Sequence, residues 1–167
     1  MNIESVDIHD IHANPANVRR HPERNLSAIK ASLARFGQQR PILVDSNGVV
    51  RAGNGTLEAA RELGWQTINI VRTGLQGSEA TAYAIADNRT ADLAEWDETA
   101  LAETLRALQG EGLLDAVGYD EGEVDELIEK LAGEIVPDFQ PASIDDQSRL
   151  DEKAKVECPE CGHEFSP

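Results

Sequence analysis

The stretch VVRAGNGTLEAARELG, residues 49–64, carries the strongest local signal in the sequence. Its β-branched start predicts a strand, and its alternation of Leu and Ala with charged residues predicts a short helix that stops at Gly64. Between the two lies the turn Gly53-Asn54-Gly55-Thr56. Backbone N–H groups converge at such a turn and the helix dipole favours negative charge, so it predicts an anion site, with Thr56 and Arg51 as further donors. The alternative is that a tight strand-to-helix turn needs glycine for steric reasons alone.

The flanking residues predict a small set of strands and helices. Near-alternating apolar residues over 6–11 indicate a strand, and a helical apolar stripe over 26–36 indicates a helix that Asn25 caps and Gly37 ends. Residues 42–44 read as a buried strand, followed by the hairpin turn Ser46-Asn47-Gly48. The β-branched run 67–71 predicts a further core strand.

The second half of the chain predicts helices and then a tail. Ser78 is placed to cap a helix that runs to about residue 88, and Asp97 to cap one with a leucine stripe at 101, 105 and 108. Asp120 and Glu123 form a capping-box pattern before a last helix that ends near Gly133. From residue 134 to 155, Pro, Asp, Gln and Ser dominate, which indicates a linker or flexible tail.

The order of these motifs resembles the N-terminal domain of the ParB/sulfiredoxin superfamily over about residues 4–93. The resemblance rests on NPANVR (14–19), GQQRPILV (37–44), a hairpin and AGNGTLEAARELG (52–64). It implies an α+β fold, a small mixed sheet with packed helices, followed by acidic helices and a flexible tail. The expected divisions are 1–93 for this domain, 94–133 for an acidic helical extension, 134–155 for a linker and 156–167 for a CxxC knuckle.

Two later segments, ADNRTADLAEWD (86–97) and GYDE (118–121), resemble ParB-like proteins of phages and mobile elements. In several of these the domain precedes a DNA methyltransferase. The chain carries no methyltransferase signature, so it resembles the free-standing form.

The resemblance also implies a nucleotide pocket, because superfamily members bind CTP, ATP or ADP. Positions near the base or triphosphate would be Gly37, Gln39, Arg40 and Pro41. Phosphates would lie at Gly53, Asn54, Gly55 and Thr56, and Asp87 with Asn88 would take the metal-binding place, which implies CTP or ATP with Mg²⁺. Where ParB has E-R-R-x-R, this chain has Asn54-Gly55-Thr56-Leu57-Glu58. Since arginine forks bind phosphate bidentately, their loss predicts a degenerate pocket. The catalytic cysteine of sulfiredoxin has no counterpart.

The formal net charge of −16 is concentrated in the second half of the chain. Residues 1–80 are close to neutral at +1, whereas residues 81–167 carry −17. Nucleic-acid binding needs clustered Lys and Arg, so this half argues against direct DNA binding by the chain alone. It is either a solvated surface, a surface for a basic partner, or a mimic of DNA.

The sequence Cys158-Pro159-Glu160-Cys161-Gly162-His163 has the pattern of half a zinc-ribbon knuckle. A structural zinc ion takes four ligands. One chain offers Cys158 and Cys161 with His163 as a third candidate, and two chains in a homodimer would supply two cysteine pairs. The alternative is a tail with two free thiols. Two cysteines make no disulfide framework, and no secretory signal or run of eighteen apolar residues is present, which predicts a cytoplasmic protein without a membrane span.

Three functions fit these patterns. The first is a phage or mobile-element ParB-like protein of DNA metabolism with a degenerate nucleotide pocket, acting through a DNA-modifying or DNA-packaging protein partner. The second is a nucleotide hydrolase or kinase that uses the Asn54–Thr56 turn and a metal held by Asp87 and Asn88. The third is an acidic DNA-mimic or anti-restriction factor.

Overall fold

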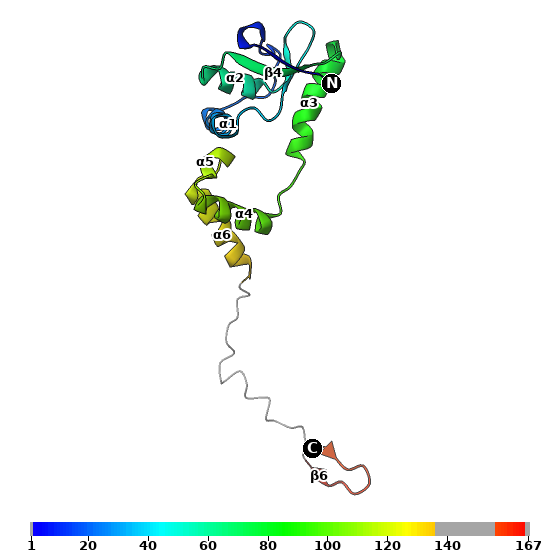
Figure 1. Ribbon diagram of the computed structural model, residues 1–167. Helices are drawn as coiled ribbons and strands as arrows, with labels where there is room; N and C mark the ends of the chain where they lie inside the picture. Colours follow the sequence, from blue (N-terminus) through cyan, green and yellow to red (C-terminus); the bar gives the residue numbers. More distant parts are fainter. Residues whose placement is uncertain (1, 136–155, 166–167) are drawn as a thin grey trace. The chain divides into compact units, whose positions relative to one another are not determined.

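A computed structural model describes residues 2–135 and 156–165 (Figure 1). The strands are β1 (Ile3–Asp7), β2 (Ile42–Val44), β3 (Val50–Ala52), β4 (Thr67–Arg72), β5 (Val156–Glu157) and β6 (Glu164–Phe165). The helices are α1 (Glu23–Phe36), α2 (Asn54–Glu62), α3 (Gly77–Asp92), α4 (Glu98–Gly110), α5 (Leu114–Val117) and α6 (Glu121–Ile135), with a short 3-10 turn at Ile8–Asp10. The fold is α+β, as predicted.

The first four strands form one mixed sheet in the order β1-β4-β2-β3. β1 runs antiparallel to β4, β4 parallel to β2, and β2 antiparallel to β3. The β2–β3 hairpin closes at the predicted turn, where the N–H of Gly48 donates to the carbonyl of Asp45 at 3.1 Å. Gly48 has a φ of 75°, and a Cβ there would lie 2.9 Å from the Asp10 carbonyl oxygen. This position therefore requires glycine.

The main core lies between this sheet and helices α1 and α2. β2 and β4 are the two inner strands, and their apolar side chains Ile42, Val44, Ile68 and Ile70 are almost completely buried. Leu57, Ala59 and Ala60 of α2 and Leu33 of α1 pack in the same cluster. The alternation predicted for residues 67–71 follows from this arrangement, because successive strand side chains point to opposite faces.

A second, smaller cluster joins α4, α5 and α6, which lie together in Figure 1. Its buried members are Leu105, Leu114 and Val124. Two predicted caps are confirmed: the Asp97 carboxylate accepts from the N–H of Ala100 at 3.0 Å, and Asp120 and Glu123 accept from each other's N–H groups at 2.9 and 3.1 Å. Each bond satisfies a donor that a helix start leaves unpaired.

Several local predictions are wrong. Helix α1 begins two residues before Asn25, after Pro22, whose fixed φ suits a helix start. The Asn25 side chain instead pairs with the His21 ring at 2.8 Å. Helix α3 follows Gln76 rather than Ser78. Phe36, the last residue of the predicted apolar stripe of α1, is 43% exposed and belongs to neither apolar cluster. The short helix α5 was not predicted.

The chain divides into two compact units, Met1–Leu131 and Ala132–Pro167. The first unit contains both apolar clusters. The division of the chain into four parts, at residues 1–93, 94–133, 134–155 and 156–167, stays a prediction. Most of the predicted linker, residues 136–155, lies outside the described residues. In the described ranges, 2–135 and 156–165, no helix has both the length and the apolar character needed to cross a membrane.

Candidate functional site

The turn that the sequence singles out connects β3 to α2. Gly53 has a φ of 100° and lets the chain reverse from the end of the strand into Asn54, the first helical residue. The first helical hydrogen bond runs from the N–H of Leu57 to the carbonyl of Gly53 at 3.0 Å. Within the described chain no side chain caps this helix. The N–H groups of its first turn can therefore face an anion.

Both glycines of the turn also have a steric role. A Cβ on Gly53 would lie 2.6 Å from Cγ2 of Ile42. A Cβ on Gly55 would lie 2.8 Å from the ring of His21 and 3.0 Å from the Ile29 side chain. These contacts give both glycines the steric role that the alternative interpretation predicts.

A cavity of about 190 Å³ lies directly at this turn. Seven predicted site residues line it: Arg51, Gly53, Asn54, Gly55, Thr56, Asp87 and Asn88. The last two come from α3, so the fold brings this helix to the start of α2, more than thirty residues earlier in the sequence.

A larger cavity of about 680 Å³ adjoins the first and shares Ala52, Gly53, Thr56 and Asp87 with it. The predicted residues Arg40 and Pro41 line this second cavity, together with apolar and aromatic side chains. Leu43, Val71, Leu75 and Tyr83 supply the apolar part. Pockets of several hundred Å³ with an apolar lining and a few polar groups are typical of small-molecule sites.

Gly37 and Gln39 line neither cavity. Gly37 ends α1 with a φ of 67°, and its N–H donates to the carbonyl of Leu33. The Gln39 amide donates to the carbonyl of Phe36. Their neighbour Gln38 has the larger structural role, because its side chain exchanges two hydrogen bonds of 2.8 Å with the backbone of Asn69 in β4.

The cations around these cavities differ in how far they are already paired. Arg51 donates to the buried carboxylate of Asp45 at 2.6 Å. Burial opposes ionisation of Asp45, but hydrogen bonds from the N–H groups of Val49 and Asn47 and from Arg51 outweigh it and lower the pKa of this carboxyl. Arg51 is therefore held by the hairpin. Arg40 is exposed and makes no ion pair with any described residue.

Residues 14–21 also contribute to the site, although they were not among the predicted site residues. Asn17, Arg19 and His21 line the smaller cavity. Arg19 also forms an exposed ion pair with Asp92 of α3 at 3.1 Å. The NPANVR motif was a usable signal, because Asn and Arg clustered in a loop commonly serve binding.

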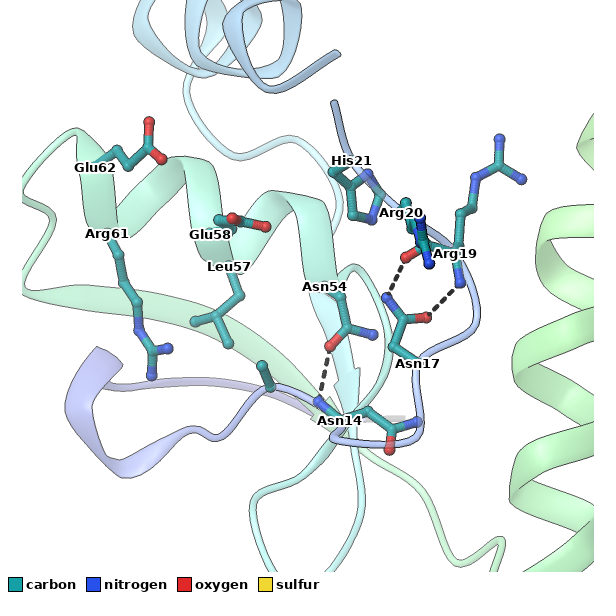
Figure 2. Close-up of a pocket in the computed structure, with 11 residues that line it drawn as sticks. Asn14, Asn17, Arg19, Arg20, His21, Asn54, Leu57, Glu58, Arg61 and Glu62 are labelled. Carbon is teal, nitrogen blue, oxygen red and sulfur yellow. Dashed lines mark hydrogen bonds between the residues drawn. The ribbon is translucent and has the colours of Figure 1, made fainter. Parts of the chain in front are cut away.

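Another cavity of about 530 Å³ lies between this segment and α2 (Figure 2). Figure 2 shows the side chain of Asn17 bonded to the backbone of Arg19 in both directions, and Asn54 bonded to the N–H of Asn14. Arg61 is occupied, since its guanidinium donates to the carbonyls of Ile8 and Ile11. The bond between Asn14 and Asn54 links residues 14–21 to the start of α2.

The two predicted metal-site residues of α3 differ in what holds them. The Asn88 amide donates to the carbonyl of Ala84 at 2.7 Å, and Asn88 lines the smaller cavity. Asp87 lines both cavities and is partly buried. A carboxylate and an amide oxygen are ligands that Mg²⁺ accepts together with phosphate oxygens.

The predicted knuckle forms a hairpin between β5 and β6. The N–H of Cys158 donates to the carbonyl of His163 at 3.0 Å, and the N–H of Gly162 donates to the carbonyl of Cys158 at 2.9 Å. Hydrogen bonds from the N–H groups of Glu160 and Cys161 lower the pKa of the Cys158 thiol. Across residues 2–135 and 156–165 no three Cys, His, Asp or Glu side chains are grouped to hold a metal, so His163 as a third ligand stays a prediction.

The mixed sheet, its helices and the pocket at the start of α2 define a class of small α+β domain. Residues 1–89 match the family described as the ParB N-terminal domain, which is more than half of the chain. The protein therefore belongs to the ParB N-terminal domain family. No curated protein matches its sequence.

Several solved structures are similar to this chain at low sequence identity, and the one with the highest TM-score of those given shows the same fold. The C-terminally truncated chromosome-partitioning protein ParB from Caulobacter crescentus, complexed with CTP-γ-S, has a TM-score of 0.68 and 22% identity, covering 83% of this chain and 81% of that one. The same protein complexed to the centromeric parS site scores 0.44, with 22% identity and coverage of 81% and 73%. A Pnob8-like ParB-N domain scores 0.44, with 15% identity and coverage of 99% and 56%.

Proposed function

We propose that the ParB-like domain binds a nucleoside triphosphate with Mg²⁺ in the two adjoining cavities at the start of α2. The observation that carries this proposal is that the predicted binding residues lie together around these cavities. Nine of the eleven binding residues predicted from the sequence line one or both cavities, although they come from separate parts of the chain. The likeness to a ParB complexed with CTP-γ-S supports the same ligand class.

Each part of the pocket suits one part of such a ligand. Phosphates would lie at the uncapped start of α2, with the Thr56 hydroxyl as an additional donor. Asp87 and Asn88 would face a magnesium ion bound to those phosphates. The base would enter the larger cavity, where the Tyr83 ring and Leu43 offer apolar contact.

Arginines from outside α2 supply part of the positive charge that the first turn of α2 lacks. The sequence Asn54–Glu58 holds no arginine, yet Arg19 lines the smaller cavity and Arg40 the larger one. Arg40 is the stronger candidate, because Arg19 would first have to leave Asp92. A pocket with fewer arginines in place at the phosphates binds them more weakly. We therefore expect a Kd in the micromolar range or weaker, which corresponds to a binding free energy no more favourable than about −8 kcal/mol.

The test is isothermal titration of the full chain with CTP, ATP, ADP and GTP in the presence of Mg²⁺. The decisive variant is Thr56→Glu, which places a carboxylate among the phosphates and should weaken binding about tenfold or more, since 1.4 kcal/mol corresponds to a factor of ten. Its matched control is Thr99→Glu, an exposed position in the first turn of α4. A first-turn carboxylate is favourable for both helices, so neither change should unfold the protein.

Two outcomes of this titration would refute the proposed nucleotide site. Absence of heat and of any thermal stabilisation with all four nucleotides would refute the pocket assignment. Equal affinity of the two glutamate variants would also refute it. Release of inorganic phosphate in the same samples would favour the predicted hydrolase alternative over a binding module, because hydrolysis transfers the phosphoryl group to water.

We further propose that the domain works in DNA metabolism through a protein partner bound by the acidic helices. The α6 carboxylates of Asp125, Glu126 and Glu129 are exposed, and residues 81–167 carry a formal charge of −17. A basic surface is the complement of such a face. Capture from the native host should lose salt-sensitive partners when Glu126 and Glu129 are changed to Gln. We also predict a phage or mobile-element origin, with a methyltransferase or packaging protein encoded nearby. If the protein were instead a DNA mimic, the captured partner would be a DNA-binding protein, and added DNA would displace it.

A further inference from the structure

The hairpin Val156–Phe165 is a very short two-stranded element. Each of its strands has only two residues. Residues 159–164 of the turn and of its second strand are exposed. A two-stranded hairpin of this size is at best marginally stable in water. A bound ligand would therefore add to its stability.

The hairpin is organised around its two cysteines. Glycine at position 162, with a φ of 71°, turns the chain so that its N–H returns to the carbonyl of Cys158. The N–H of Cys158 in turn donates to the carbonyl of His163 at 3.0 Å. These two backbone bonds hold together the ends of the turn that carries both thiols. Both thiols are free.

One copy of the hairpin supplies only half of a metal site. A structural zinc ion is bound by four ligands in a tetrahedron. Three glutamates lie in the hairpin, at 157, 160 and 164, and His163 follows the second cysteine. Among the described residues none of these completes a group of three metal-binding side chains. Two ligand positions of a zinc ion held by Cys158 and Cys161 therefore have to come from elsewhere.

We propose that two copies of the hairpin together bind one zinc ion through Cys158 and Cys161 of each copy. A second copy offers an identical pair of thiols. A twofold axis through the ion relates the two pairs and completes the tetrahedron without any further residue. Metal binding also adds to the stability of the hairpin, since folding and binding are coupled in small metal sites. Zinc thereby makes the chain a dimer at this end, independently of the nucleotide site.

The primary measurement is the zinc content of the full chain, purified under reducing conditions after zinc loading, with thiols counted in the same sample. We expect about 0.5 zinc per chain, because each ion serves two chains. Cys158→Ser and Cys161→Ser should each bring zinc to background. His163→Ala is the matched control and should keep the same ratio. Cobalt substitution should give strong thiolate-to-metal absorption that is unchanged in His163→Ala.

A second measurement follows the assembly. Sedimentation should show a dimer with zinc that dissociates on chelation, while the far-ultraviolet dichroism of α1–α6 stays unchanged. One zinc per chain that is lost in His163→Ala would overturn the proposal, because it would place the site within one chain. Zinc retained by the double serine variant, no zinc on fully reduced protein, or zinc held jointly with a different protein would overturn it as well.

Discussion

The side-chain oxygen of Asn54 accepts a hydrogen bond of 2.9 Å from the backbone N–H of Asn14, forty residues earlier in the chain (Figure 2). Asn54 is the first residue of α2, where a polar side chain often bonds to its own helix. Here it links the 14–21 segment to the Gly53–Thr56 turn instead. The contact places Asn17 and Arg19 beside the cavity and leaves the N–H groups of the turn available.

Replacing Asn54 by Ala should therefore affect both stability and binding. The N–H of Asn14 is partly buried, and losing its acceptor should cost about 1 kcal/mol of unfolding free energy. Nucleotide affinity should fall as well, since the 14–21 segment is no longer fixed. Denaturant unfolding and titration calorimetry measure the two effects. Asn47→Ala, an exposed turn position, is the control, and equal losses in both variants would contradict the assignment.

Replacing Gly53 by Ala should be among the most damaging changes in the domain. The new Cβ would lie 2.6 Å from Ile42 Cγ2 in the buried core, at a φ of 100°. Strain and overpacking together should cost about 3 kcal/mol. Gly64→Ala is the matched control, since its φ is 75° but nothing lies within 4 Å of the added Cβ. It should cost only about 1 kcal/mol, and thermal or urea unfolding that ranked the two equally would rule out the clash.

Acid should destabilise the domain through Asp45. Its pKa in the folded protein is lowered below the ordinary value of 3.8, because the hydrogen bonds from Val49, Asn47 and Arg51 outweigh the effect of burial. The stabilisation is therefore complete above pH 3.8 and is lost as the pH falls through the folded-state pKa. Asp45→Asn should remove this part of the pH dependence and lower the unfolding free energy at pH 7 by about 2 kcal/mol. Urea unfolding between pH 7 and pH 2.5 tests this, with exposed Asp10→Asn as the control.

Glu123 should contribute to the start of α6 in two separable ways. Its carboxylate accepts from the N–H of Asp120 and also pairs with Arg24 of α1. That pair lowers the pKa of Glu123 and raises the pKa of Arg24. Glu123→Gln keeps an acceptor for the helix start but loses the ion pair, whereas Glu123→Ala loses both. Amide hydrogen exchange of the first α6 turn should increase more in the alanine variant, and the reverse order would contradict the capping role.

The full chain alone should not bind DNA at physiological ionic strength. Residues 81–167 carry −17, and phosphate neutralisation requires clustered basic side chains. Gel mobility of plasmid DNA at about 0.15 M salt is the measurement. A shift that weakens steeply with added salt would show a basic surface that the charge distribution does not predict.

The local structure could be predicted from the sequence wherever it depends on contacts between residues close together in the chain. Asp97 and Asp120 start helices because their carboxylates reach N–H groups three residues on, and Gly48 closes the hairpin because it tolerates a positive φ. The alternation over 67–71 fixed β4. The same local logic failed at Asn25, because its side chain found a better partner in His21.

The arrangement of the candidate site depends on the packing of the sheet and helices, which the sequence pattern does not show. The sequence could not show that Gly53 is required by Ile42, that Arg51 is held by buried Asp45, or that Asn17 and Arg19 join the cavity. These contacts link residues far apart in the chain, and their distances depend on how the sheet and helices pack. A motif specifies which groups are available, whereas packing decides which of them are already paired and which still face a ligand.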